Sequence, residues 1–135
     1  MGNSNPLFTA VPEAGWATMT AANTATGGTG TVGTIFTAHA TNGGYVQKII
    51  GRPLGTNVAS VARIFLNNGL TNATAANNTL IAEIGLQATT VSQVAAQTGA
   101  ELNLNIPIPP GYRLMVALGT AQAAGWAFTA IGGDY

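Results

Sequence analysis

The chain has 135 residues, no cysteine and equal numbers of acidic and basic side chains, and only 6% of its residues are charged. A typical globular chain has about 25% charged residues, so most outward-facing positions of this protein must be neutral. The composition excludes disulfides, thiolate nucleophiles and cysteine-ligated metals, and the zero net charge argues against nucleic acid as a partner.

The first residues, MGNSNPLF, lack both the basic segment and the apolar segment of a signal peptide. No apolar run approaches the roughly 20 residues that a membrane-spanning helix needs. We therefore expect a soluble protein that is made in the cytosol and has no membrane as partner.

Residues 1–12 mix asparagines and prolines with the apolar residues Leu7, Phe8 and Val11. Such a segment is too short and too often interrupted by proline to form a core of its own. We expect an extended N-terminal arm here, with Leu7, Phe8, Val11 and Pro12 in contact with a partner subunit. A plain floppy terminus remains the alternative.

Apolar and polar residues alternate in many segments after the arm, which is the period-two pattern of half-buried β-strands. The clearest case alternates Leu102, Leu104 and Ile106 with polar neighbours. The pattern predicts strands over residues 16–21, 31–40, 45–52, 58–66, 80–87, 101–108, 113–118 and 126–131, of which the first is the least distinct. The segment 92–97, with Ser92 as a cap, is the one short helix that we predict.

Turn-forming pairs such as Asn42-Gly43 and Asn68-Gly69 separate these segments. Short strands with this punctuation predict that residues 13–135 form one all-β domain, an antiparallel β-sandwich of the jelly-roll type. The predicted core consists of the inward-facing apolar residues of its later strands, Leu80, Ile84, Leu102, Leu104, Ile106, Leu114 and Val116.

The segment GTGTVG at positions 28–33 matches the dinucleotide-binding pattern G-x-G-x-x-G. That pattern works only with a strand before it, a helix after it and an acidic residue about 20 positions later. Here a strand is predicted after the motif, and the next acidic residue is Glu83. We therefore interpret the segment as a glycine-rich loop without a nucleotide.

The side chains that could support catalysis are few, namely His39 and the carboxylates Glu13, Glu83, Glu101 and Asp134. A lone histidine cannot form a multi-histidine metal site, and no spacing assembles a serine–histidine–acid triad. Glu83 and Glu101 would act as a glycosidase pair only if neighbouring strands brought them together, and isolated surface carboxylates are the interpretation that we favour. We predict no catalytic, metal or cofactor site and no enzymatic activity.

Arg63 alternates with apolar neighbours on a strand face that should not be fully solvated. It is a candidate interface residue that meets a partner's carboxylate or carbonyls, but pairing with Glu83 or simple exposure is also open. Several strands carry large apolar side chains on both faces, as Leu114 and Met115 do. Either two sheets are sandwiched or an oligomer covers the second face.

A neutral surface protects a free monomer poorly against association with its own copies. Together with the two-faced apolar strands, this property predicts a homo-oligomer, and we expect a trimer.

Several segments carry a family resemblance: IFTA at 35–38, GRPLGTNVA at 51–59, ARIFLNNG at 62–69, PPGYRL at 109–114, and the ending from GW at 125–126 to GGDY at 132–135. Through them, most of the chain beyond the arm resembles small virion structural proteins of tailed bacteriophages. No catalytic signature is part of this resemblance.

The resemblance implies a capsid cement or decoration protein that binds the outside of the major capsid protein shell and bridges capsomers. It would then lie on the capsid surface of the virion after synthesis in the host cytoplasm. A tail, baseplate or fibre-associated subunit is the alternative within the virion. From another class, a carbohydrate-binding β-sandwich would use Trp16, Tyr45, Tyr112 and Trp126 as stacking platforms, although such aromatic residues are more often part of a core.

Overall fold

The computed structural model describes residues 9–135. Within this range the chain forms eight β-strands, one short 3₁₀ turn and no α-helix. The strands are β1 (Val11–Met19), β2 (Gly33–Thr37), β3 (Gly44–Pro53), β4 (Ser60–Asn67), β5 (Asn78–Leu86), β6 (Ala100–Ile108), β7 (Arg113–Leu118) and β8 (Trp126–Asp134), and the turn η1 (Ala75–Asn77) precedes β5. No helix of the described part is long and apolar enough to cross a membrane.

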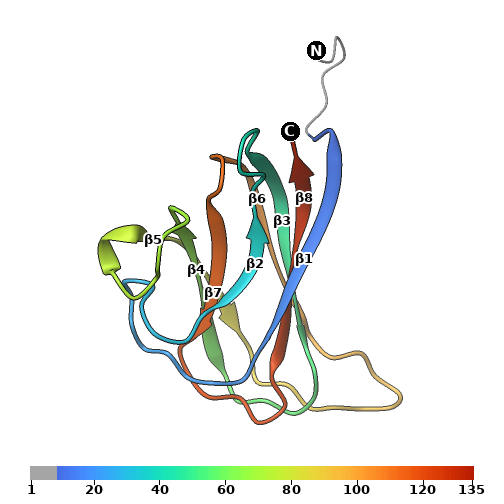
Figure 1. The fold of residues 1–135 in the computed structure, drawn as a ribbon. Coiled ribbons are helices and arrows are strands. Elements are labelled where there is room, and N and C mark those ends of the chain that lie inside the picture. The colour runs from blue at the N-terminus through green and yellow to red at the C-terminus, as the bar shows by residue number, and fades with distance from the viewer. Residues whose placement is uncertain (1–8) are drawn as a thin grey trace.

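Two four-stranded antiparallel sheets face each other (Figure 1). The first sheet has the strand order β1-β8-β3-β6, and the second has the order β2-β7-β4-β5. The predicted β-sandwich is therefore confirmed as two packed antiparallel sheets. Most connections gather at two ends, with residues 54–59, 87–99 and 119–125 at one end and residues 38–43, 68–77 and 109–112 at the other, whereas residues 20–32 run from the first end across the second sheet toward the start of β5.

The predicted strands are all present, but the first one starts earlier than expected. Val11 and Pro12, expected in the arm, are the first residues of β1 and pair with Asp134 and Gly133 of β8. Leu7 and Phe8 lie outside the described residues. The arm expected over residues 1–12 therefore overlaps the sandwich at its last two positions.

The helix predicted over residues 92–97 is wrong, because this segment is an irregular part of the β5–β6 loop. Oγ of Ser92 does accept the backbone N–H groups of Val94 and Ala95, as a capping serine does. A single cap cannot offset the cost of nucleating so short a helix.

The core lies between the sheets and includes a stacked aromatic pair. Trp126 and Phe128 project inward from β8 with ring centroids 6.2 Å apart and an interplanar angle of 15°. The inward-facing residues Ile49, Ile64 and Leu114 are fully buried around them. Burying each such side chain contributes about 1.5 to 3 kcal/mol relative to leaving it in water.

The predicted core residues are buried to different extents. Ile84, Leu114 and Val116 are buried as predicted. Leu102 and Leu104, like Ile106, pack against the core but are only half-buried, because β6 is an edge strand of the first sheet.

The prediction that Leu80 lies in the core is wrong, since Leu80 is 37% exposed. A bulge shifts the register between β4 and β5, so that Ile64 pairs with Ala82 while Phe65 pairs with Leu80. The extra residue, Ile81, packs against the core together with Ala82. Beyond the bulge the alternation is inverted, and Leu80 faces outward.

The second sheet also buries apolar side chains on its outer face. Phe65, Met115 and Ala117 are buried there against Val32, which belongs to the β1–β2 connection. This connection is hydrogen-bonded to the end of β7 through Asn23 and to the start of β5 through its glycine carbonyls, so it crosses the sheet. The chain itself therefore covers the second apolar face, and these residues need no oligomer to bury them.

We predict that Leu114→Ala costs about 2 to 5 kcal/mol of unfolding free energy, because the truncation leaves a cavity in the closed core. Leu80→Ala should cost less than about 1 kcal/mol, because its side chain is partly in water. Urea unfolding followed by circular dichroism measures both values. Equal costs for the two variants would place Leu80 in the core after all.

Candidate functional site

The eight charged side chains all lie in the described part of the chain, and each has a partner within it. Lys48 pairs with Glu101 at 2.9 Å, and Arg63 pairs with Glu83 at 3.0 Å. Nη2 of Arg52 donates to the carbonyl of Gln97 over 2.9 Å. The remaining three are Arg113, which donates to Asn67, and Asp134 and Glu13, which are hydrogen-bonded to each other. The fold thus uses its charged groups internally.

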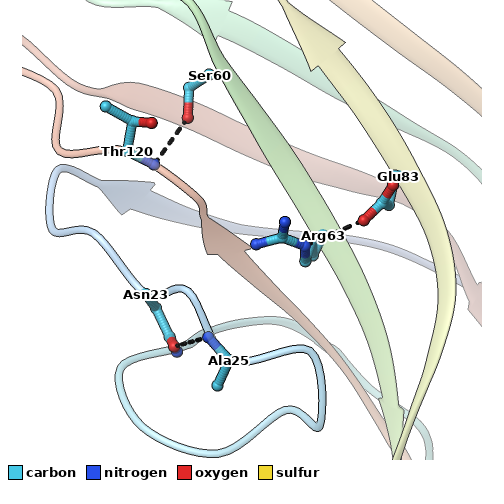
Figure 2. A network of polar contacts seen from close by, with 6 residues as sticks. All are labelled: Asn23, Ala25, Ser60, Arg63, Glu83 and Thr120. Atoms are coloured by element: carbon cyan, nitrogen blue, oxygen red, sulfur yellow. Dashed lines mark hydrogen bonds and ion pairs between the residues drawn. The ribbon is translucent and has the colours of Figure 1, made fainter.

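Arg63, predicted as an interface residue, contacts its own chain on the outer face of the second sheet. Figure 2 shows its guanidinium group reaching from β4 to Glu83 on β5. Its side chain is only 18% exposed. Of the interpretations left open by the sequence, pairing with Glu83 accounts for its position. Glu83 and Glu101 lie on different sheets, each in its own ion pair, and do not form a carboxylate pair.

Glu13, His39 and Asp134 meet at the end of the sandwich that holds residues 38–43. The backbone N–H of His39 donates to Oδ1 of the buried Asp134 over 2.9 Å. Partial desolvation, a hydrogen bond that protonated Glu13 donates to Asp134 and repulsion by the Asp134 carboxylate raise the pKa of Glu13 above its ordinary value, while His39 acts in the opposite direction. Nδ1 of His39 accepts the N–H groups of Thr41 and Asn42. This cluster therefore ties a turn to β1 and β8.

No group of three or more histidine, aspartate or glutamate side chains that could hold a metal ion occurs within residues 9–135. The sequence motif at positions 28–33 lies in the β1–β2 connection, followed by β2.

Asparagine side chains hold this glycine-rich connection against the second sheet. Nδ2 of Asn72 donates to the carbonyls of Gly28 and Gly30, and Nδ2 of Asn78 donates to the carbonyl of Gly27. Gly28 and Gly30 have φ angles of 77° and 81°, which glycine adopts without steric cost. The motif is thus a structural loop clamped over a small apolar cluster, which explains why the residue pattern needs so many glycines.

The most distinctive surface is formed by residues 54–59, 87–99 and 119–125, which we call the loop end. The three loops lie along the lower edge of Figure 1 and contain no charged residue. Four large apolar side chains project from them, since Leu54, Val58 and Val91 are more than half exposed and Val94 is 97% exposed. Exposed apolar side chains on neighbouring loops are a usual sign of an interaction site.

Asn57, whose side chain is buried, fixes the three loops to one another through its side chain and its backbone. Its Oδ1 accepts the N–H groups of Ala124 and Gly125, and its Nδ2 donates to the carbonyls of Gly55 and Gly125. The backbone of Asn57 pairs in both directions with Thr89, whose hydroxyl donates to Gly55 over 2.7 Å. The loop end is therefore a preorganised surface, which loses little conformational entropy on binding.

One further contact anchors the loop end to the sandwich, and another joins two of its loops. Oγ of Ser60, at the start of β4, accepts the N–H of Thr120, as Figure 2 shows. The backbone N–H of Leu54 donates to the carbonyl of Gly125.

The outer face of the first sheet carries two of the four aromatic residues considered for sugar stacking. Trp16 on β1 is 70% exposed. Tyr45 on β3 is half-buried, and its hydroxyl donates to Oδ1 of Asn105 over 2.9 Å beside a shallow pocket. Trp126 lies in the core, and Tyr112 packs against that core. We therefore assign neither residue as a stacking platform.

The sequence reasoning missed the loop end. The sequence pattern predicts Val58 in a strand and Val94 in the short helix, and no local motif marks Asn57 as the residue that joins the loops. The available signal was the absence of charge from three separate loops, which becomes informative only when the fold brings these loops together.

Comparisons with protein-family models, with curated proteins and with solved structures found no match.

We predict that Asn57→Ala lowers the unfolding free energy by at least about 2 kcal/mol, because it leaves N–H and carbonyl groups of the loops 54–59 and 119–125 without partners. Asn103→Ala is the matched control, because Asn103 is exposed on β6 and should change stability by less than about 0.5 kcal/mol. Urea unfolding measures both values. An unchanged unfolding free energy in the Asn57→Ala variant would contradict the assigned role of this side chain.

Proposed function

We propose that this protein is a non-enzymatic structural subunit of a tailed-bacteriophage virion. In this proposal it is a cement or decoration protein that binds the outside of the major capsid protein shell and bridges capsomers. One observation carries the proposal. The charged side chains have partners within the same chain, while apolar side chains are exposed on a rigid, uncharged loop end.

Such a surface favours recognition by shape and neutral contacts. Acid–base and nucleophilic catalysis need ionisable groups that are positioned toward a substrate. A protein that bridges other subunits needs instead area, complementarity and a rigid scaffold. The resemblance of the sequence to phage virion proteins indicates a virion as the kind of assembly. The neutral surface is consistent with a protein that partners cover.

The proposal includes a jelly-roll topology for the sandwich. Its support is the pairing of β1 with β8, β2 with β7, β3 with β6 and β4 with β5. This order results when one long antiparallel hairpin of eight strands wraps into two sheets. Jelly rolls of this kind recur in viral capsid and lectin domains.

Self-association into a trimer is also part of the proposal. The outer face of the second sheet no longer supports it, since the chain covers that face itself. The remaining support is the uncharged surface and the exposed apolar residues of the loop end. A trimer would match positions of threefold symmetry on a shell, where three capsomers meet.

A carbohydrate-binding module is the candidate of another class, and exposed Trp16 is the observation that favours it. An exposed indole on a flat sheet can stack on a sugar ring. Binding of the isolated protein to a glycan array, lost in Trp16→Ala, would favour this function over a structural one.

The proposed function predicts that the protein covers the whole capsid in a fixed ratio to the major capsid protein. Quantitative mass spectrometry of purified virions gives the ratio, and immunogold labelling gives the location. Labelling confined to the tail or to one vertex would favour a tail, baseplate or fibre-associated subunit. A virion without this protein would contradict the proposal as a whole.

A further inference from the structure

The loop end and the opposite end of the sandwich differ in charge. The loop end contains no ionisable residue, whereas Glu13, His39, Arg113 and Asp134 lie toward the other end. Two arginines border the loop end, but Arg52 donates to the carbonyl of Gln97 and Arg63 pairs with Glu83. The three loops themselves therefore offer no charge to a partner, while Arg52, whose acceptor is a neutral carbonyl, keeps its positive charge at their rim.

We infer that the loop end is the surface that seats on the shell and that it selects an uncharged protein surface as its partner. This inference rests on the proposed function and names the contact face within it. Val58 follows Asn57 and Val91 lies two residues after Thr89, so the backbone pairing of Asn57 with Thr89 holds the two segments that carry these exposed valines together. Leu54 and Val94 are two further exposed apolar residues of the loop end.

The chemistry of the partner follows from desolvation. A charged group buried against the loop end would lose its hydration and gain no counter-charge, which disfavours binding. An apolar, amide or hydroxyl surface has no such cost. Nucleic acid and anionic lipid are disfavoured for the same reason, and the lack of basic residues removes the long-range attraction that they need. The occupant is thus a neutral protein surface, here that of a shell subunit.

The test uses virions stripped of this protein and measures rebinding of the full chain by sedimentation. Val58→Asp and Val94→Asp each place an uncompensated charge in the contact and should weaken rebinding by about tenfold or more. Val94→Asp cannot disturb the core, because this side chain is 97% exposed. Wild-type rebinding should change less than about threefold between 0.1 and 1 M NaCl, because no ion pair contributes.

Leu70→Asp is the matched control. Leu70 is an exposed apolar residue in the loop at the opposite end, so this variant should rebind like the wild type. Thermal melting verifies that all variants are folded.

The outcomes separate the inference from the proposed function. If the wild type rebinds and the two valine variants rebind equally well, the loop end is not the contact face. If Leu70→Asp weakens rebinding as much as they do, the contact lies elsewhere or is not localised. Failure of the wild type to rebind at any salt concentration would overturn the proposed function itself. Binding to neutral phosphatidylcholine vesicles that Val94→Asp abolishes would replace the protein partner by a membrane.

Discussion

The fold depends on asparagine side chains that hydrogen-bond to backbone groups of distant loops. A chain with so few charged residues cannot fix its loops through ion pairs. A carboxamide has both donors and an acceptor, so one buried asparagine can satisfy several backbone groups. The side chain of Asn57 does this for residues 54–59 and 119–125 of the loop end, and the side chains of Asn67 and Asn78 do it at the opposite end. Loops that are held in this way can remain free of charge and still be rigid.

The use of asparagine side chains to hold loops also explains how the outer face of the second sheet is covered. Asn72 and Asn78 hold the glycine-rich connection over Phe65 and Met115, so the connection is part of the core. Without these contacts two strands would expose apolar residues on both faces. The protein thus closes one apolar face within its own chain and leaves the apolar residues of the loop end exposed. That contrast makes the loop end a candidate for function.

The sequence predicts the strands well because their alternation is local. It fails where a long-range contact or a bulge decides the result. Leu80 follows the alternation of its strand, but the bulge at Ile81 inverts the facing, and no turn residue marks that position. The capping pattern at Ser92 is real, yet one cap cannot offset the cost of nucleating so short a helix.

The candidate site is predictable only in part. Arg63 was identified as unusual, and the structure explains it by an ion pair with Glu83 on a neighbouring strand. The loop end joins residues that are up to 68 positions apart through Asn57, and no local pattern in the sequence indicates such contacts. The absence of charge, by contrast, is fully visible in the sequence and limits the type of partner.

The central claim is that the loop end meets the shell. Hydrogen–deuterium exchange of the free protein and of the protein bound to virions tests it most directly, because exchange slows at backbone amides that a partner covers. The account predicts slower exchange on binding in residues 54–59, 87–99 and 119–125, with residues 38–43 and 68–77 unchanged. Slower exchange at residues 38–43 and 68–77, with the loop end unaffected, would contradict it.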